Sequence, residues 1–155
     1  LPIFLSSHLM LPTSLVFAVY ILNSGAGVAG YIVASHRSDS VNERSALNRI
    51  VIFRAVLAFA FIGAALVPTY QVASTALILV LYNFAYALFL VFMLSLTMEL
   101  IPAGKSGLFN VLIGAGAAGG SFIGPFLAEE FGFAYVFIVT GAVFLFSYIV
   151  FKIFS

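Results

Sequence analysis

Apolar residues along the chain fall into five long runs, separated by short stretches of polar residues, glycine and proline. The runs cover residues 13–34, 49–70, 72–98, 107–128 and 132–153. Each run is close to the roughly 20 residues that a helix needs to cross the ~30 Å hydrocarbon core of a bilayer. The pattern therefore predicts an all-α integral membrane protein with five transmembrane helices. Because the connections are short, neighbouring helices are expected to pack antiparallel in one bundle.

All six Lys and Arg residues lie in or beside segments on one side of the membrane that these runs define. They are Arg37, Arg44, Arg49, Arg54, Lys105 and Lys152. The segments on the other side, 1–12, 71 and 129–131, contain no basic residue. Because Lys and Arg are retained in cytoplasmic loops, loops 35–48 and 99–106 are expected to be cytoplasmic. The prediction is a multi-pass protein of the cell membrane, with the N-terminus outside and the C-terminus in the cytoplasm.

Composition agrees with a chain embedded in lipid, since 64% of the residues are hydrophobic and 7% are charged. Soluble domains carry about 25% charged residues. With a net charge of +1, the basic residues mark topology and do not form a surface for nucleic acid. The chain has no cysteine, which excludes disulfides and thiolate metal sites. Neither a metal nor another cofactor is expected.

The first residues have the features of an interrupted helix rather than of a signal peptide. Leu1–Leu11 lacks a basic segment and ends at Pro12 instead of a small-residue cleavage site. We expect residues 1–12 to be the outer end of a preceding helix and an outer loop, and the chain to be a fragment of a longer membrane protein.

Polar side chains near the middle of the apolar runs are candidates for function, because a polar group in lipid is costly unless it is hydrogen-bonded or hydrated. Six such residues lie on three of the predicted helices: Tyr20, Asn23, Tyr82, Asn83, Tyr86 and Asn110. Helical spacing places the first two on one face and the next three on another. The faces predict either the lining of a water-filled substrate pathway or, alternatively, hydrogen bonds that only join helices.

The fourth run contains a repeated small-residue pattern, Gly116-x3-Gly120-x3-Gly124, followed directly by Pro125. Small residues four positions apart let two helices approach closely. Proline removes a backbone hydrogen bond and permits a kink. The pattern predicts static close packing or a hinge in a helix that moves, and the two interpretations are compatible.

Charged residues near the basic side indicate a cytoplasmic ion-pair cluster of Arg37, Arg54, Glu99 and Lys105. Arg54 lies about one turn inside its run, from where its side chain can reach the interface. An ion pair between Arg54 and a nearby carboxylate is favoured over a contact with substrate. The carboxylates considered are Glu99, Asp39 and Glu43.

The sequence lacks the motifs of membrane-embedded enzymes. It has no paired carboxylates at membrane depth, no His-Glu-x-x-His helix and no phosphate-binding glycine loop. The chain is therefore not expected to be an enzyme.

The stretch Met98–Ala128 resembles the connection between the tenth and eleventh helices of major facilitator superfamily transporters. In that family an acidic residue, the motif P-x-x-x-[RK]-G, a helix with Gly and Asn, and a Gly-Pro end recur in this order. The matching residues are Glu99, Pro102, Lys105, Gly107, Asn110, Gly120, Gly124 and Pro125. Gly30–Arg37 is similar to the family's Gly-x-x-x-Asp-Arg loop after the eighth helix, with Ala34 and Ser35 where the Asp is expected.

This resemblance implies that the five helices are the eighth to twelfth of twelve and form most of a C-terminal six-helix bundle. It also implies that the first, third and fourth helices of this chain face a substrate pathway. The expected function is transport of a small solute by a secondary transporter, through alternating access between two helical bundles. The expected partners are the lipid bilayer, the missing N-terminal half and a small-molecule substrate. The alternatives are a non-transporting helical subunit of a larger membrane complex and, third, an embedded enzyme with catalytic groups elsewhere.

Overall fold

The computed structural model describes residues 11–37, 42–66, 71–100 and 106–154. Within these ranges the chain forms five α-helices: α1 (Thr13–Arg37), α2 (Glu43–Leu66), α3 (Gln71–Leu100), α4 (Ser106–Glu130) and α5 (Phe133–Phe154). All five are long and apolar enough to cross a membrane, which is compatible with a multi-pass membrane protein. The prediction of an all-α chain with five helices of membrane-spanning length is confirmed. The expected end of a preceding helix, Leu1–Leu5, lies outside the described residues.

α2 begins at Glu43, well before the predicted apolar run of residues 49–70. The reason is a cap: the Oδ1 atom of Asn42 accepts a hydrogen bond from the backbone N–H of Ser45 at 3.2 Å. An Asn cap satisfies one of the N–H groups that have no partner within a helix, and so extends the helix through polar residues. As a result, Arg54 lies about three turns from the start of α2.

A tight turn joins α4 to α5 and makes them antiparallel. Gly132 has a positive φ of 86°, a backbone conformation that side chains other than glycine rarely adopt. Its carbonyl accepts a hydrogen bond from the N–H of Tyr135 at 3.2 Å, which begins the next helix. Gly132 therefore ends one helix and starts the other within a few residues.

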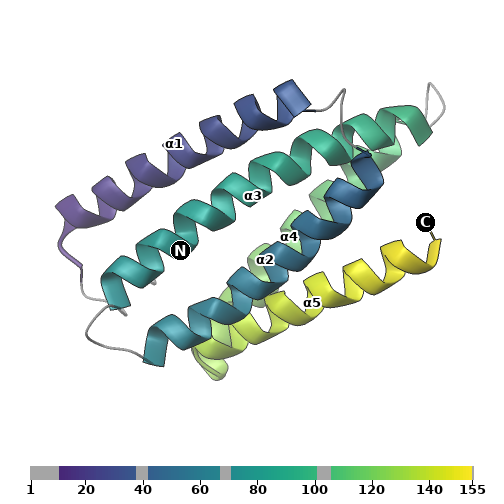
Figure 1. Cartoon of the computed structure of the whole chain (residues 1–155). Helices are drawn as coiled ribbons and strands as arrows, with labels where there is room; N and C mark the ends of the chain where they lie inside the picture. The colour runs from purple at the N-terminus through teal and green to yellow at the C-terminus, as the bar shows by residue number, and fades with distance from the viewer. Residues whose placement is uncertain (1–10, 38–41, 67–70, 101–105, 155) are drawn as a thin grey trace.

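The helices alternate in direction, so the ends of α1, α3 and α5 and the starts of α2 and α4 lie at the same end of the molecule (Figure 1). We call this the basic end, since it carries Arg37, Arg44, Arg49 and Lys152. α3 packs against α1 on one side and α2 on the other, and α2 packs in turn against α5. α4 meets α5 much less extensively than these three pairs meet each other.

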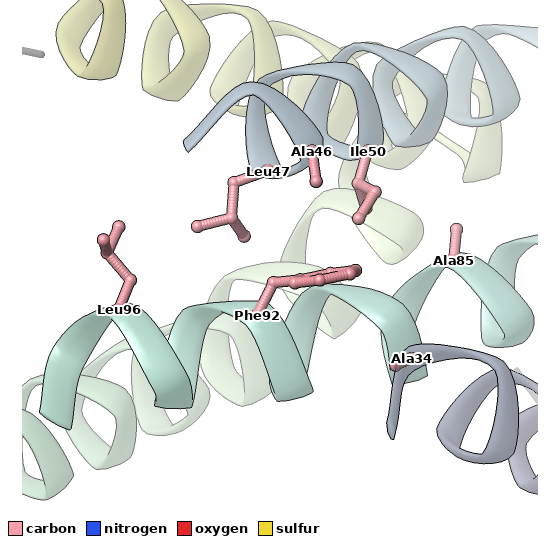
Figure 2. Close-up of a cluster of buried hydrophobic side chains, with 7 residues drawn as sticks. All are labelled: Ala34, Ala46, Leu47, Ile50, Ala85, Phe92 and Leu96. Carbon is pink, nitrogen blue, oxygen red and sulfur yellow. The ribbon is translucent and has the colours of Figure 1, made fainter. Parts of the chain in front are cut away.

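A cluster of buried apolar side chains holds α1, α2 and α3 together toward the basic end. Its members are Ala34, Ala46, Leu47, Ile50, Ala85, Phe92 and Leu96. Figure 2 shows Leu47 and Ile50 extending from α2 toward Phe92 on α3. The Ser95 hydroxyl donates a hydrogen bond to the Glu43 carboxylate at 2.5 Å in the same region. Together these contacts fix α2 against α3; we call this cluster the basic-end core.

A second cluster of buried apolar side chains lies toward the other end of the bundle. It contains Val19, Leu57, Phe61, Ala64, Ile78 and Leu79, from α1, α2 and α3. Phe61 also stacks on Phe137 of α5, with ring centroids 4.6 Å apart. We call this cluster the opposite core. Between the two cores, each of these helices has a short middle segment, and that segment contains the polar residues described next.

Candidate functional site

A pocket of about 270 Å³ lies between the helices beside the opposite core, and two members of that core, Phe61 and Leu79, form part of its wall. Four helices contribute to its wall through Asn23, Ala58, Phe61, Leu79, Tyr82, Asn83, Val136, Phe137 and Thr140. Three of the residues expected from the sequence, Asn23, Tyr82 and Asn83, are therefore brought to one place. Most of the remaining wall is apolar, so the pocket combines a few polar groups with an apolar lining, as small-molecule sites do.

Asn83 lines this pocket and also joins two helices. Its Nδ2 atom donates a hydrogen bond to the backbone carbonyl of Asn23 at 2.6 Å. The side chain of Asn23, by contrast, makes no hydrogen bond with another described residue. Asn83 therefore joins two helices at the pocket wall, and a role in binding a solute stays a prediction for both residues.

The close approach of α1 and α3 depends on glycine. A Cβ atom added at Gly27 would lie 2.9 Å from Nδ2 of Asn83, and one added at Gly30 would lie 2.7 Å from the carbonyl oxygen of Phe84. Small residues at such crossings let helix backbones approach closely in membranes. The sequence signal was available, because Gly27, Gly30 and Ala34 share one helical face. A third close site joins α5 to α2, where a Cβ at Gly141 would meet the ring of Phe59 at 2.6 Å.

The predicted glycine pattern of α4 has no such neighbour. A Cβ atom added at Gly116, Gly120 or Gly124 would meet nothing within 4 Å among the described residues. Pro125 lies within α4 and is exposed. The prediction that this face of α4 packs closely against another helix, or acts as a hinge, is therefore not tested by the described residues. Asn110 is also exposed on α4 and does not reach the pocket.

Arg54 is the unexpected feature of this region. It is only 7% exposed and is surrounded by four aromatic rings from α3 and α5. The distances from its Cζ atom to the ring centroids are 4.3 Å for Phe144, 4.9 Å for Tyr82, 5.2 Å for Tyr86 and 5.2 Å for Phe89. Each such cation–π contact stabilises a guanidinium by about 0.5–2 kcal/mol. We call these four rings the aromatic cage.

The predicted ion pair of Arg54 with Glu99 or Glu43 is not formed in the part of the chain that the structure describes. Arg54 lies near the middle of the candidate span Glu43–Ala64, too far from its start to reach the basic end. Its Nη2 atom instead donates a hydrogen bond to the Tyr82 hydroxyl at 3.3 Å, and its buried Nε atom has no hydrogen-bond partner among the described residues. The physical reason is distance, because Glu43 and Arg54 are separated by about three turns of continuous helix, roughly 16 Å.

The other members of the predicted ion-pair cluster lie at the basic end or outside the residues that the structure describes. Arg37 and Glu99 are exposed near the ends of α1 and α3, while Lys105 and Asp39 lie outside the described residues. Arg54 is thus set apart from the cluster in which the sequence placed it.

Tyr82 connects Arg54 to the pocket. Tyr82 forms part of the pocket wall, and its hydroxyl oxygen accepts the hydrogen bond from Arg54. We call Asn23, Arg54, Tyr82 and Asn83 the polar layer, since they lie between the basic-end core and the opposite core along their helices. Two other predicted residues lie beside it: Tyr20 packs against the opposite core, and Tyr86 belongs to the aromatic cage.

The polar layer offers hydrogen-bonding groups and one positive charge. No group of three or more His, Cys, Asp or Glu residues is close enough to hold a metal ion in the described ranges. The available groups are neutral amides and hydroxyls together with one buried guanidinium. Such a set recognises a polar or negatively charged solute through hydrogen bonds and charge. No family model, curated protein or solved structure matches this chain.

Proposed function

We propose that the chain forms most of the C-terminal helical bundle of a secondary transporter of the major facilitator type, and that it moves a small solute across a membrane. The observation that carries this proposal is the pocket between four helices, where polar residues from α1 and α3 meet side chains of α2 and α5. Transporters of this kind bind their substrates near the bilayer midplane and expose the site alternately to each side.

The surface of α4 supports the same proposal. Its small residues are exposed over most of the helix, and it has only limited contact with α5. A helix rich in glycine offers a smooth face for close packing or sliding against another bundle. In the proposed protein, that bundle is the missing N-terminal half, and the basic end of this chain faces the cytoplasm.

The rival proposal is a helical subunit of a larger membrane complex that does not transport. The exposed face of α4 also favours this reading, since a static partner could cover it. The two proposals differ in one property: only a transporter opens its central pocket to both sides of the membrane.

A cysteine at the pocket wall distinguishes them. The chain has no cysteine of its own, so Thr140→Cys in an otherwise cysteine-free full-length protein provides one reporter. We expect small membrane-impermeant thiol reagents to label it from either side in sealed vesicles. Val56→Cys is the control, because Val56 is 57% exposed on α2 and does not line the pocket. Labelling of Thr140→Cys from one side only, or from neither, would refute alternating access and favour the subunit.

A further inference from the structure

We propose that the transported solute is a small organic anion, and that its carboxylate is recognised by the Tyr82 hydroxyl at the pocket wall and by the positive charge of Arg54 behind that hydroxyl. This inference rests on the proposed function. Its starting point is the charge of Arg54, which is 93% buried near the middle of a candidate membrane span. A guanidinium does not lose its proton in proteins, so burial cannot neutralise it as it can a lysine.

No negative charge in the described chain balances Arg54. Its contacts are the aromatic cage and the Tyr82 hydroxyl, and none of these carries a formal negative charge. The quadrupoles of four rings stabilise the cation in part, but they leave its charge uncompensated. A buried charge normally has a partner of opposite sign. The site is therefore suited to an anion that arrives from outside the described chain.

The hydrogen-bonding groups favour a carboxylate. Arg54 is not part of the pocket wall, so its positive charge acts on a solute in the pocket through the Tyr82 hydroxyl, which it contacts. The Nε atom of Arg54 is buried and has no partner among the described residues. The Tyr82 hydroxyl accepts a hydrogen bond from Arg54 at 3.3 Å, which leaves its own proton free to donate to an anion in the pocket.

The volume and lining of the pocket indicate the size and polarity of the rest of the solute. Ala58, Phe61, Leu79, Val136 and Phe137 form apolar walls around a volume of about 270 Å³. This is slightly below the usual range for small-molecule sites, about 300–1,000 Å³. The pocket therefore suits a compact apolar or aromatic body, while the amide of Asn23 can meet one further polar group.

A carboxylate from a solute and one from a side chain of the missing half would satisfy Arg54 equally well. The two sources differ in what happens when Arg54 is removed. If the partner is a solute, Arg54→Met folds normally, because it removes an unpaired buried charge and retains volume. If the partner is a fixed carboxylate, the same change leaves that carboxylate buried alone and strongly destabilises the protein.

The experiment uses the full-length protein with Thr140→Cys as its only cysteine, and benzoate and benzamide as probes. We expect millimolar benzoate to slow labelling of the cysteine, and the neutral isostere benzamide to have much less effect. Arg54→Met is expected to weaken protection by benzoate about tenfold, because the positive charge behind the Tyr82 hydroxyl is lost. Tyr82→Phe removes only the hydroxyl and is expected to weaken protection several-fold, whereas the control Tyr135→Phe leaves it unchanged.

Three results would overturn the inference. Equal protection by benzoate and benzamide would remove the requirement for an anion. Unchanged protection by benzoate in Arg54→Met would exclude Arg54 as the recognising residue. A large loss of thermal stability in Arg54→Met, without protection of the parent protein by benzoate, would assign the counter-charge to the missing half. In each case, labelling of Thr140→Cys from both sides would leave the proposed function standing; loss of two-sided labelling would refute that function itself.

Discussion

At the residue scale, two asparagines of the same polar layer have different roles. The hydrogen bond between α1 and α3 uses the side chain of Asn83 but only the backbone of Asn23. Truncation of one side chain therefore removes the bond, and truncation of the other preserves it. This difference predicts that Asn83 stabilises the bundle and that the side chain of Asn23 is available to a solute.

We therefore expect Asn83→Ala to lower the stability of the full-length protein by about 0.6–1.7 kcal/mol, the range for hydrogen bonds between membrane helices. Asn23→Ala should have much less effect on stability while impairing transport, because its amide contributes no hydrogen bond within the described chain. Thermal unfolding in detergent, measured beside uptake in vesicles, tests both variants. Equal destabilisation by the two changes would contradict the separate roles.

At the element scale, the contact between α1 and α3 depends on where glycine is placed. Gly30 lies close to the backbone of α3, whereas a Cβ atom added at Gly25 on the same helix would meet no described residue within 4 Å. Glycine in an open helical position is less stable than alanine by about 0.5–1 kcal/mol, because it loses more conformational freedom on folding. The two positions therefore predict opposite effects for the same substitution.

Gly30→Ala is expected to destabilise the protein by about 1–3 kcal/mol, since the new methyl group must move the carbonyl oxygen of Phe84 away from 2.7 Å. Gly25→Ala is expected to be neutral or mildly stabilising. Thermal unfolding of the two variants in the same detergent tests the pair. Tolerance of Gly30→Ala equal to that of Gly25→Ala would show that the two helices do not approach this closely.

Helix number and order followed from hydrophobic runs, because a run of membrane-spanning length has few alternatives to a helix. The depth of Arg54 did not follow, because the start of α2 depends on the Asn42 cap in a polar stretch rather than on hydrophobicity. The hydrophobic pattern also did not show which helices pack against each other. Small residues occur on both α1 and α4, and only packing distinguishes Gly30, which has a close neighbour, from Gly120, which has none among the described residues.

At the scale of the whole molecule, the distribution of charge separates into two parts. Arg37, Arg44, Arg49 and Lys152 lie together at the basic end, and Lys and Arg residues are generally retained on the cytoplasmic side of a membrane. Arg54, by contrast, is buried among aromatic rings between the helices and is not one of the charges at the basic end. The orientation expected from the sequence does not depend on Arg54, because the remaining basic residues agree without it.

The basic end is therefore expected to face the cytoplasm, which places Ser40 inside and Glu130 outside. Ser40 lies outside the described residues, in the segment between α1 and α2, and Glu130 ends α4 at the opposite end of the bundle. In a cysteine-free full-length protein, Glu130→Cys should react with an impermeant thiol reagent added to intact cells. Ser40→Cys should react only after the cells are opened, which also shows that the reagent can reach it. The reverse pattern would invert the topology, and labelling of both positions in intact cells would mean that a helix between them does not cross the membrane.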